Sequence, residues 1–228
     1  MTTGESSLYM RGEAGTDVTL EIGRAGQSQP FDVVVTRGVI NVPSVRSREL
    51  VDGYWLIRVS RFQRDSGEEV ADAISSAKEK GPVKGLILDV RNNPGGVMGA
   101  SVEMAGALLD GGLVVYTQGR HPQSDKEYEA AAGDMLPGVP VVVLINGGSA
   151  SASEIVAGAL QDRGRAVIMG TQSFGKGSVQ TVLPVSETRA LKLTTSLYYT
   201  PSGRSIQAEG IVPDVVVERA TITSIENN

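Results

Sequence analysis

The sequence of 228 residues contains no cysteine and only one histidine, His121. The absence of cysteine excludes thiol nucleophiles, thiolate zinc sites, iron–sulfur clusters and disulfides. A single histidine excludes metal sites of the H-E-x-x-H kind, and a Ser–His–Asp triad would have to use His121. The chemistry of the chain must therefore come from His121 or from groups other than thiols and histidine clusters.

Aromatic residues make up only 4% of the chain, and 26 acidic residues outnumber 21 basic ones, for a net charge of −5. Proteins that bind nucleic acid need basic patches and rings for stacking, so we expect no nucleic-acid partner. The longest apolar run, Val139–Ile145, is far shorter than the roughly 20 residues that span a bilayer. The polar, acidic start at Met1–Glu5 is not a signal peptide. We therefore expect no membrane span in this chain.

The first forty residues predict the end of a helix followed by two strands. Apolar and polar residues alternate at Asp17–Ile22 and at Phe31–Thr36, as they do in half-buried strands. Two strands cannot bury a core by themselves. We therefore expect residues 1–40 to be an appendage or the remnant of a small domain, and residues 41–228 to form the main domain.

From Gly53 onward, strand and helix patterns alternate, which is typical of an α/β core with mixed strand pairing. The near-continuous apolar run Gly85–Val90 predicts a strand covered on both faces, and the spacing Ser66-x-x-Glu69 predicts a capping box. Residues 119–138 are expected to be polar and irregular. The expected strands are Tyr54–Val59, Gly85–Val90, Gly112–Gln118, Val139–Ile145, Ala166–Met169, Ser178–Leu183 and Leu191–Tyr199, and the expected helices run from Ser66 to Lys80, from Val97 to Leu109 and from Ala152 to Gln161.

The turn after Val139–Ile145 carries three serines, Ser149, Ser151 and Ser153, among glycines and alanines at the start of a helix. Small neighbours let a substrate backbone approach, and a helix N-terminus stabilises developing negative charge. A serine there could act as a nucleophile while the next N–H helps to hold the oxyanion. The spacing Ser151-x-x-Glu154 also fits a capping box, and the local sequence by itself favours this purely structural role.

A serine nucleophile needs a base, and the sequence offers two candidates. His121 lies in the polar stretch, where a surface role is the simpler interpretation. Lys176 is flanked by glycines and by apolar strands that could bury its amine, and burial lowers a lysine pKa from about 10.4 toward that of a general base. Gln180, at even spacing on the same predicted strand face, could orient the amine. Without further information, a lysine in such a position is more often just a loop cation.

Gly170–Lys176 also matches the phosphate-binding pattern G-x-x-x-x-G-K. Gly177 stands where that pattern needs a serine or threonine, and a strand pattern follows where a helix is required. A nucleotide-binding function is therefore the weakest of the alternatives.

The stretch Arg91–Gly96 is rich in turn residues, and two interpretations of it stay open. Structurally, Asn-Asn-Pro-Gly-Gly is a strong turn. Functionally, Gly95 and Gly96 could present a bare N–H at a strand end as a second oxyanion donor.

Taken together, several segments resemble the carboxyl-terminal processing (tail-specific) serine proteases. They occur in the order of that family and cover the chain from about Val42 to Glu218. The resemblance implies a ClpP/crotonase-like α/β fold, a mixed β core with flanking helices. The matching segments are Leu88–Gly96, Gly148–Glu154, Ser173–Gln180, Tyr199–Gln207 and Gly210–Asp214.

The resemblance also implies the roles of individual residues. Ser151 corresponds to the nucleophile, Lys176 to the general base and Gln180 to the residue that orients the lysine. Ala152 and Gly96 correspond to the two backbone oxyanion donors. The implied reaction is hydrolysis of a peptide bond near a C-terminus through an acyl-enzyme, with no metal or cofactor. The implied partners are proteins or peptides with accessible C-terminal tails, and the implied location is extracytoplasmic (periplasm or cell envelope); a homo-oligomer is compatible with the family.

The N-terminus departs from the family pattern, because members carry a complete PDZ domain that binds the substrate tail. Ser6–Thr36 resembles only the last helix and strands of such a domain, a truncated β-rich PDZ remnant. The carboxylate-binding loop and the strand that pairs with the peptide are expected to lie before Met1, together with the family's signal or anchor. The alternative hypothesis is a catalytically silent peptide-binding or assembly module, whose incomplete PDZ domain fails to align the catalytic pair.

Overall fold

The structure is a computed structural model that describes residues 3–39 and 42–217. The chain divides into two compact units, residues 1–43 and 44–228. In the first unit, helix α1 (Thr3–Met10) precedes an antiparallel hairpin of β1 (Asp17–Ile22) and β2 (Phe31–Thr36). The guanidinium of Arg37, just after β2, donates to the carbonyl oxygens of Tyr9 and Met10 at 3.3 and 2.9 Å. Arg37 thereby satisfies carbonyls that the end of α1 leaves unpaired.

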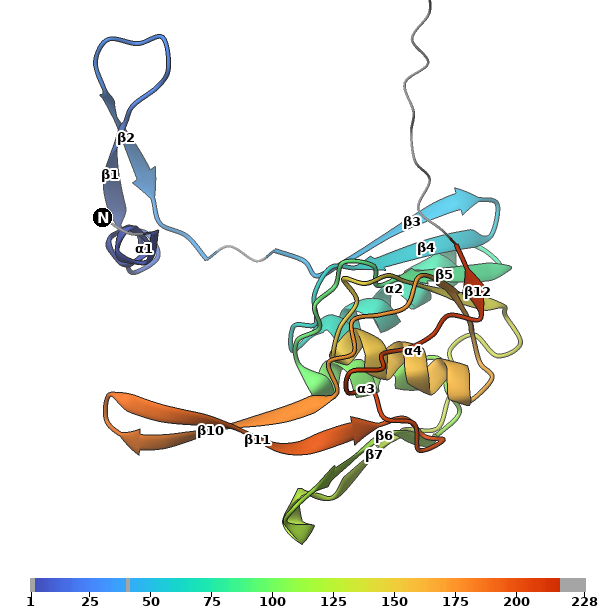
Figure 1. The fold of residues 1–228 in the computed structure, drawn as a ribbon. Coiled ribbons are helices and arrows are strands. Elements are labelled where there is room, and N and C mark those ends of the chain that lie inside the picture. Colours follow the sequence, from blue (N-terminus) through green and yellow to red (C-terminus); the bar gives the residue numbers. More distant parts are fainter. Residues whose placement is uncertain (1–2, 40–41, 218–228) are drawn as a thin grey trace, which may run out of the picture. The chain divides into compact units, whose positions relative to one another are not determined.

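The second unit contains two sheets with helices packed between them (Figure 1). The six-stranded sheet has the order β12-β9-β8-β5-β4-β3, parallel except for the antiparallel edge pair β3–β4. The four-stranded sheet is antiparallel, in the order β10-β11-β6-β7. The strands are β3 (Val45–Val51), β4 (Tyr54–Val59), β5 (Gly85–Asp89), β6 (Gly112–Gly119), β7 (Lys126–Ala130), β8 (Val141–Ile145), β9 (Val167–Gly170), β10 (Ser178–Ser186), β11 (Arg189–Tyr199) and β12 (Val215–Val216), and the helices are α2 (Ser66–Lys80), α3 (Met98–Gly106), η1 (Pro122–Ser124) and α4 (Ala152–Asp162).

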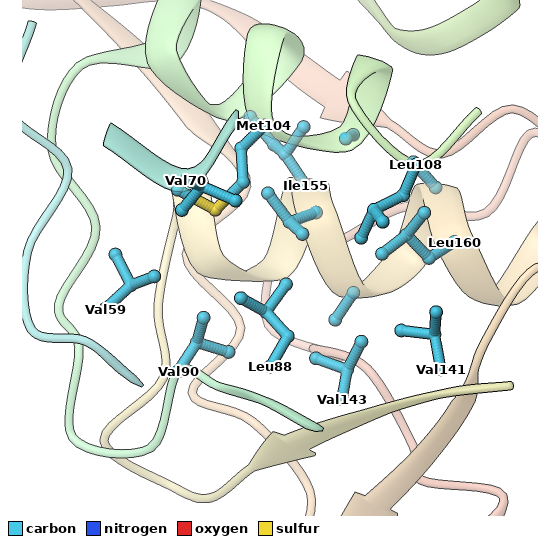
Figure 2. Packing of buried hydrophobic residues seen from close by; sticks show 14 of the residues in the cluster. Val59, Val70, Leu88, Val90, Met104, Leu108, Val141, Val143, Ile155 and Leu160 are labelled. Carbon is cyan, nitrogen blue, oxygen red and sulfur yellow. The ribbon is translucent and has the colours of Figure 1, made fainter. Parts of the chain in front are cut away.

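The main core lies between the parallel strands and the helices. Figure 2 shows Leu88 of β5 and Val143 of β8 facing Ile155 of α4, with Met104 of α3 above them. All four side chains are buried, and full burial of such a side chain contributes about 1.5–3 kcal/mol. Helix α4 is buried along nine successive residues, from Ala152 to Leu160, because it also packs against β6 of the second sheet. The start of α4 is therefore an interior position.

The mixed α/β architecture predicted from the sequence is confirmed, and β1, β2 and β4 have the predicted bounds. The irregular structure predicted for residues 119–138 is wrong at Lys126–Ala130, because β7 pairs with β6 there. The strands β3, β7 and β12 were not predicted; β7, for instance, presents mostly charged side chains and only Tyr128 and Ala130 inward. None of the described helices is long and apolar enough to cross a membrane.

The burial predicted for β5 is nearly complete, since four of its five residues are buried and Ile87 is half-buried. One finer prediction about the second unit is wrong. The capping box at α2 does not form: Asp65 is the N-cap, and the Ser66 hydroxyl accepts the Gln63 N–H at 2.7 Å.

Candidate active site

The three candidate serines lie in the turn between β8 and α4, and the structure separates them. The hydroxyls of Ser149 and Ser153 are fully buried and donate to the carbonyl oxygens of Val90 and Asn93, at 2.8 and 2.9 Å. Ser151 is only half-buried. Ser149 and Ser153 hold the turn against the strand end after β5, and Ser151 is the accessible hydroxyl of the three.

Ser151 has an unusual backbone conformation, with φ 56° and ψ −113°. A residue with a Cβ rarely adopts positive φ, and such strain costs of the order of 1–3 kcal/mol. The sharp turn places Ser151 directly before the first helical residue, Ala152. The predicted capping box with Glu154 does form, so Ser151 is the N-cap as well as the accessible serine.

Glu154 joins the Ser151 turn to the loop that carries Lys176. Its carboxylate is fully buried and accepts four hydrogen bonds. Oε1 accepts from the Ser173 hydroxyl and the Gly175 N–H, both at 2.6 Å. Oε2 accepts from the N–H groups of Ser151 and Lys176, at 2.7 and 2.9 Å. One carboxylate oxygen thus holds the backbone nitrogens of the predicted nucleophile and base close to each other.

The loop after β5 packs against the Ser151 turn through Asn93 and Gly95. Asn93 is fully buried; its side-chain amide donates to the Val59 carbonyl at 3.0 Å, and its Oδ1 accepts the Gly95 N–H at 2.9 Å. A Cβ on Gly95 would lie 2.6 Å from the Ala150 carbonyl oxygen and 2.9 Å from the Ser151 Cβ. Only glycine fits this approach. Asn93 was not predicted as a site residue, since an asparagine in a turn is an unremarkable signal.

The two predicted oxyanion donors, Gly96 and Ala152, are backbone N–H groups with no hydrogen-bond acceptor in residues 3–39 and 42–217. Phe62 holds Gly96 in place, donating its N–H to the Gly95 carbonyl at 3.0 Å and accepting the Val97 N–H at 2.9 Å. A Cβ on Gly96 would lie 2.0 Å from the Phe62 carbonyl oxygen. Gly96 is exposed and Ala152 is buried, so of the two residues only Gly96 lies open to solvent in the free chain.

A buried carboxylate, Asp89, anchors the start of the same loop. Its oxygens accept hydrogen bonds from the backbone and guanidinium of Arg91 and pair with Arg58 at 2.8 Å. Burial raises the pKa of Asp89, but the hydrogen bonds from Arg91 and Arg58 outweigh burial and hold the pKa below its usual value. Asp89 is therefore an ionised anchor at neutral pH.

The prediction that apolar strands bury the Lys176 amine is wrong in this structure, because the Lys176 side chain is exposed. Its neighbours Gly175 and Gly177 are the buried residues, packed against Ala208 and Gln207, and this leaves Lys176 on the solvent side. Within the described part of the chain, no hydrogen bond or ion pair holds its amine.

Gln180 is also exposed, and it does not share a strand face with Lys176, which lies outside β10. Lys176 precedes β10, and a register shift between Val179 and Gln180 interrupts the alternation of the strand. The phosphate-loop alternative is wrong, since β10 follows Lys176 where a helix is needed. His121 lies at the exposed turn of η1, where its Nδ1 accepts the Gln123 N–H at 3.3 Å.

A cavity of about 600 Å³ lies beside these elements, between α3 and the four-stranded sheet. Met98, two residues after Gly96, and Val179, next to Gln180, contribute to its wall. Tyr128 and Tyr198 add apolar surface, and Lys126 adds a positive charge. Ser151 and Lys176 do not line the cavity. Its link to the candidate site is that Met98 and Val179, which do line it, are close in sequence to Gly96 and Gln180.

Comparisons with known proteins identify relatives of the chain. Residues 53–217 match the sequence profile of Peptidase family S41. A carboxy-terminal-processing protease of Bartonella bacilliformis is 49% identical over 96% of this chain and 51% of that protein. A carboxyl-terminal-processing protease of Synechocystis is 40% identical over 97% of this chain and 52% of that protein. Among solved structures, the photosystem II D1 C-terminal processing protease matches with a TM-score of 0.70 and 32% identity, over 91% of this chain and 57% of that one. The chain spans about half the length of the curated relatives it matches.

Proposed function

Because the chain belongs to peptidase family S41, we propose that it is a serine endopeptidase that cleaves proteins near their C-terminus. The observation that carries the proposal is the shared oxygen of Glu154, which binds the N–H groups of Ser151 and Lys176 together. Ser151 is also the one accessible hydroxyl of its turn. The shared oxygen keeps the backbones of Ser151 and Lys176 close together, although the two residues are 25 positions apart in sequence, and this supports their proposed roles as nucleophile and base.

In the proposed reaction, the Ser151 hydroxyl attacks the peptide carbonyl and its proton passes to the Lys176 amine, which Gln180 orients. The N–H groups of Gly96 and Ala152 stabilise the oxyanion. The protonated amine then donates to the leaving nitrogen, and water hydrolyses the acyl-enzyme by the reverse transfers. Because Lys176 is exposed in the free chain, we propose that the bound peptide supplies the desolvation that its role as a base requires.

The proposed substrates are proteins or peptides with accessible C-terminal tails, bound with side chains in the cavity lined by Met98 and Val179. We propose that residues 1–40 are the PDZ-like part of the protein and residues 41–228 its protease core. An extracytoplasmic location and homo-oligomeric assembly follow from the family resemblance and belong to the same proposal.

The second candidate function is a catalytically silent peptide-binding or assembly module. The exposed Lys176 side chain favours it, because no described residue holds the amine toward Ser151 or Gln180. The two candidates share the fold and differ in whether Ser151 reacts.

Labelling with a fluorophosphonate probe, followed by a peptide-cleavage assay, separates these candidates. We expect labelling of the 228-residue chain to be abolished in Ser151→Ala and strongly reduced in Lys176→Ala. Ser75→Ala, which removes an exposed hydroxyl on α2, and His121→Ala should leave labelling unchanged, as should EDTA. Persistent labelling in Ser151→Ala or loss with EDTA would overturn the dyad, and absence of labelling in every form supports the silent module.

A further inference from the structure

Buried hydrogen bonds lead from Glu154 to a segment far along the chain. The Ser173 hydroxyl donates to Glu154 at 2.6 Å and accepts the Ile211 N–H at 2.7 Å. The Ser173 N–H in turn donates to the Ile211 carbonyl at 3.1 Å. Ser173 is 8% exposed and Ile211 1%. A continuous chain of hydrogen bonds therefore runs from Ile211 through Ser173 to Glu154, where it is buried, and on to the N–H groups of Ser151 and Lys176, where it is partly buried.

The segment 206–211, which we call the wrapping segment, also contacts both glycines beside Lys176. The Ala208 N–H donates to the Gly175 carbonyl at 2.8 Å. The Gly177 N–H donates to the Gln207 side chain at 3.1 Å, and a Cβ on Gly177 would lie 2.3 Å from the Gln207 nitrogen. The wrapping segment therefore fixes the backbone on either side of Lys176.

Backbone contacts matter here because the Lys176 side chain itself has no partner in the described part of the chain. The position of its Cα relative to Ser151 is set by the bonds to Glu154 and to the wrapping segment. Hydrogen bonds to a carboxylate are about twice as strong as neutral ones, and burial strengthens them further. Ser173 is the side chain that links the two sets of bonds.

We propose that Ser173 is a positioning residue, through which the wrapping segment holds the loop of Lys176 in register with the turn of Ser151. This inference rests on the proposed peptidase function, and it adds a role for the wrapping segment that the dyad leaves unexplained. Ser173 touches neither substrate nor reacting atoms; it acts through Glu154.

The test compares Ser173→Ala with Ser44→Ala. Ser44 is a matched control, since it is equally buried and its hydroxyl donates at 2.6 Å to another helix-start carboxylate, Glu69. We expect Ser173→Ala to lower the fluorophosphonate labelling rate and kcat about tenfold, as loss of one charge-assisted hydrogen bond would, with KM changed less than about twofold. Ser44→Ala should leave labelling rate, kcat and KM unchanged.

A second measurement does not depend on activity. Amide hydrogen exchange of Gly175 and Lys176, followed by NMR, should accelerate at least about tenfold in Ser173→Ala and remain unchanged in Ser44→Ala. Ser173→Cys keeps a weak donor and should give intermediate values in both measurements, which also covers the case that Ser173→Ala does not fold. Accelerated exchange in a chain that never labels would retain the positioning role and reject the peptidase.

The inference would be overturned by wild-type labelling and exchange in Ser173→Ala. Equal losses in Ser173→Ala and Ser44→Ala would overturn it too, because they would show a general effect on stability.

Discussion

The sequence Ser-x-x-Glu stands at the start of both α2 and α4, and the two copies are used differently. In α4, Glu154 is fully buried and binds four donors from two loops. In α2, Glu69 is half-buried and accepts a hydrogen bond from Ser44, while Ser66 serves the turn before its own helix. The same local signal is therefore a surface arrangement in one helix and the centre of the candidate active site in the other.

Burial accounts for the difference. A carboxylate in the interior is stable only when donors satisfy both oxygens, so the start of α4 has to gather N–H groups from its surroundings. A half-buried carboxylate such as Glu69 can complete its hydrogen bonding with water. The buried carboxylate of Glu154 thus holds together two loops that are distant in sequence. Replacing this carboxylate should therefore affect both loops.

The largest expected effect is the difference between Glu154→Gln and Glu69→Gln. A glutamine at position 154 would turn an N–H₂ group toward backbone N–H donors, and breaking such a buried network costs about 3–5 kcal/mol. Glu69→Gln should cost about 1 kcal/mol or less. Urea unfolding measures both values, and equal losses would show that the two helix starts are equivalent after all.

The second-largest expected loss of stability is that of Gly95→Ala, because the added Cβ would clash with Ala150 and Ser151 and the backbone has a φ of +95°. We expect a loss of about 2–3 kcal/mol in unfolding free energy together with loss of labelling. Gly99→Ala is the matched control: it lies in α3 with open space around its Cα and should stabilise the chain by about 0.5–1 kcal/mol. A loss of unfolding free energy well below this value in Gly95→Ala would show that the loop after β5 can move to accommodate a Cβ.

A smaller effect separates two substitutions of the nucleophile. Ser151→Ala and Ser151→Gly both remove the hydroxyl, but only glycine relieves the positive φ of 56°. We expect the glycine variant to be more stable by about 1 kcal/mol, with neither variant labelled. Thermal unfolding checks this, and a more stable alanine variant would argue against a strained turn at the start of α4.

The smallest expected effect concerns pH. The pKa of Asp89 is held below its usual value in the folded chain, so its contribution to stability is fully present above the unfolded-state value of about 3.9. That contribution is lost as pH falls through the lower folded pKa. Asp89→Asn should therefore flatten the fall in stability of the wild type below about pH 4, as measured by urea unfolding across pH. An unchanged slope would show that Arg58 and Arg91 do not stabilise the ionised form.

Much of the fold was predictable because its patterns are local. Strand β4 and the hairpin of β1 and β2 have the predicted bounds, since alternation of apolar and polar residues directly reflects a half-buried strand. Strand β7 escaped prediction, because a charged edge strand that exposes most of its side chains carries no such pattern. Its pairing with β6 became visible only in the fold.

The residues of the candidate site could be predicted from the sequence, but their burial and packing could not. The turn of Ser151 and the glycines of the loop after β5 follow from small residues at element ends. The burial expected for Lys176 is wrong, because the tight packing of Gly175 and Gly177 on the wrapping segment turns the lysine outward. Nothing near Lys176 in the sequence records that packing.

The sequence by itself limited which chemical groups were available: without cysteine there is no thiol, and with one histidine the base for a serine had to be His121 or another group such as the Lys176 amine. It also determined where strands end and α4 begins, because periodicity and turn residues act over short distances. The tertiary structure alone decided that Glu154 would be fully buried while Glu69 stayed half-buried, and that Ser151 rather than Ser149 or Ser153 would be accessible. Burial and hydrogen-bond partners depend on segments far apart in the chain, and only the packed fold brings those segments together.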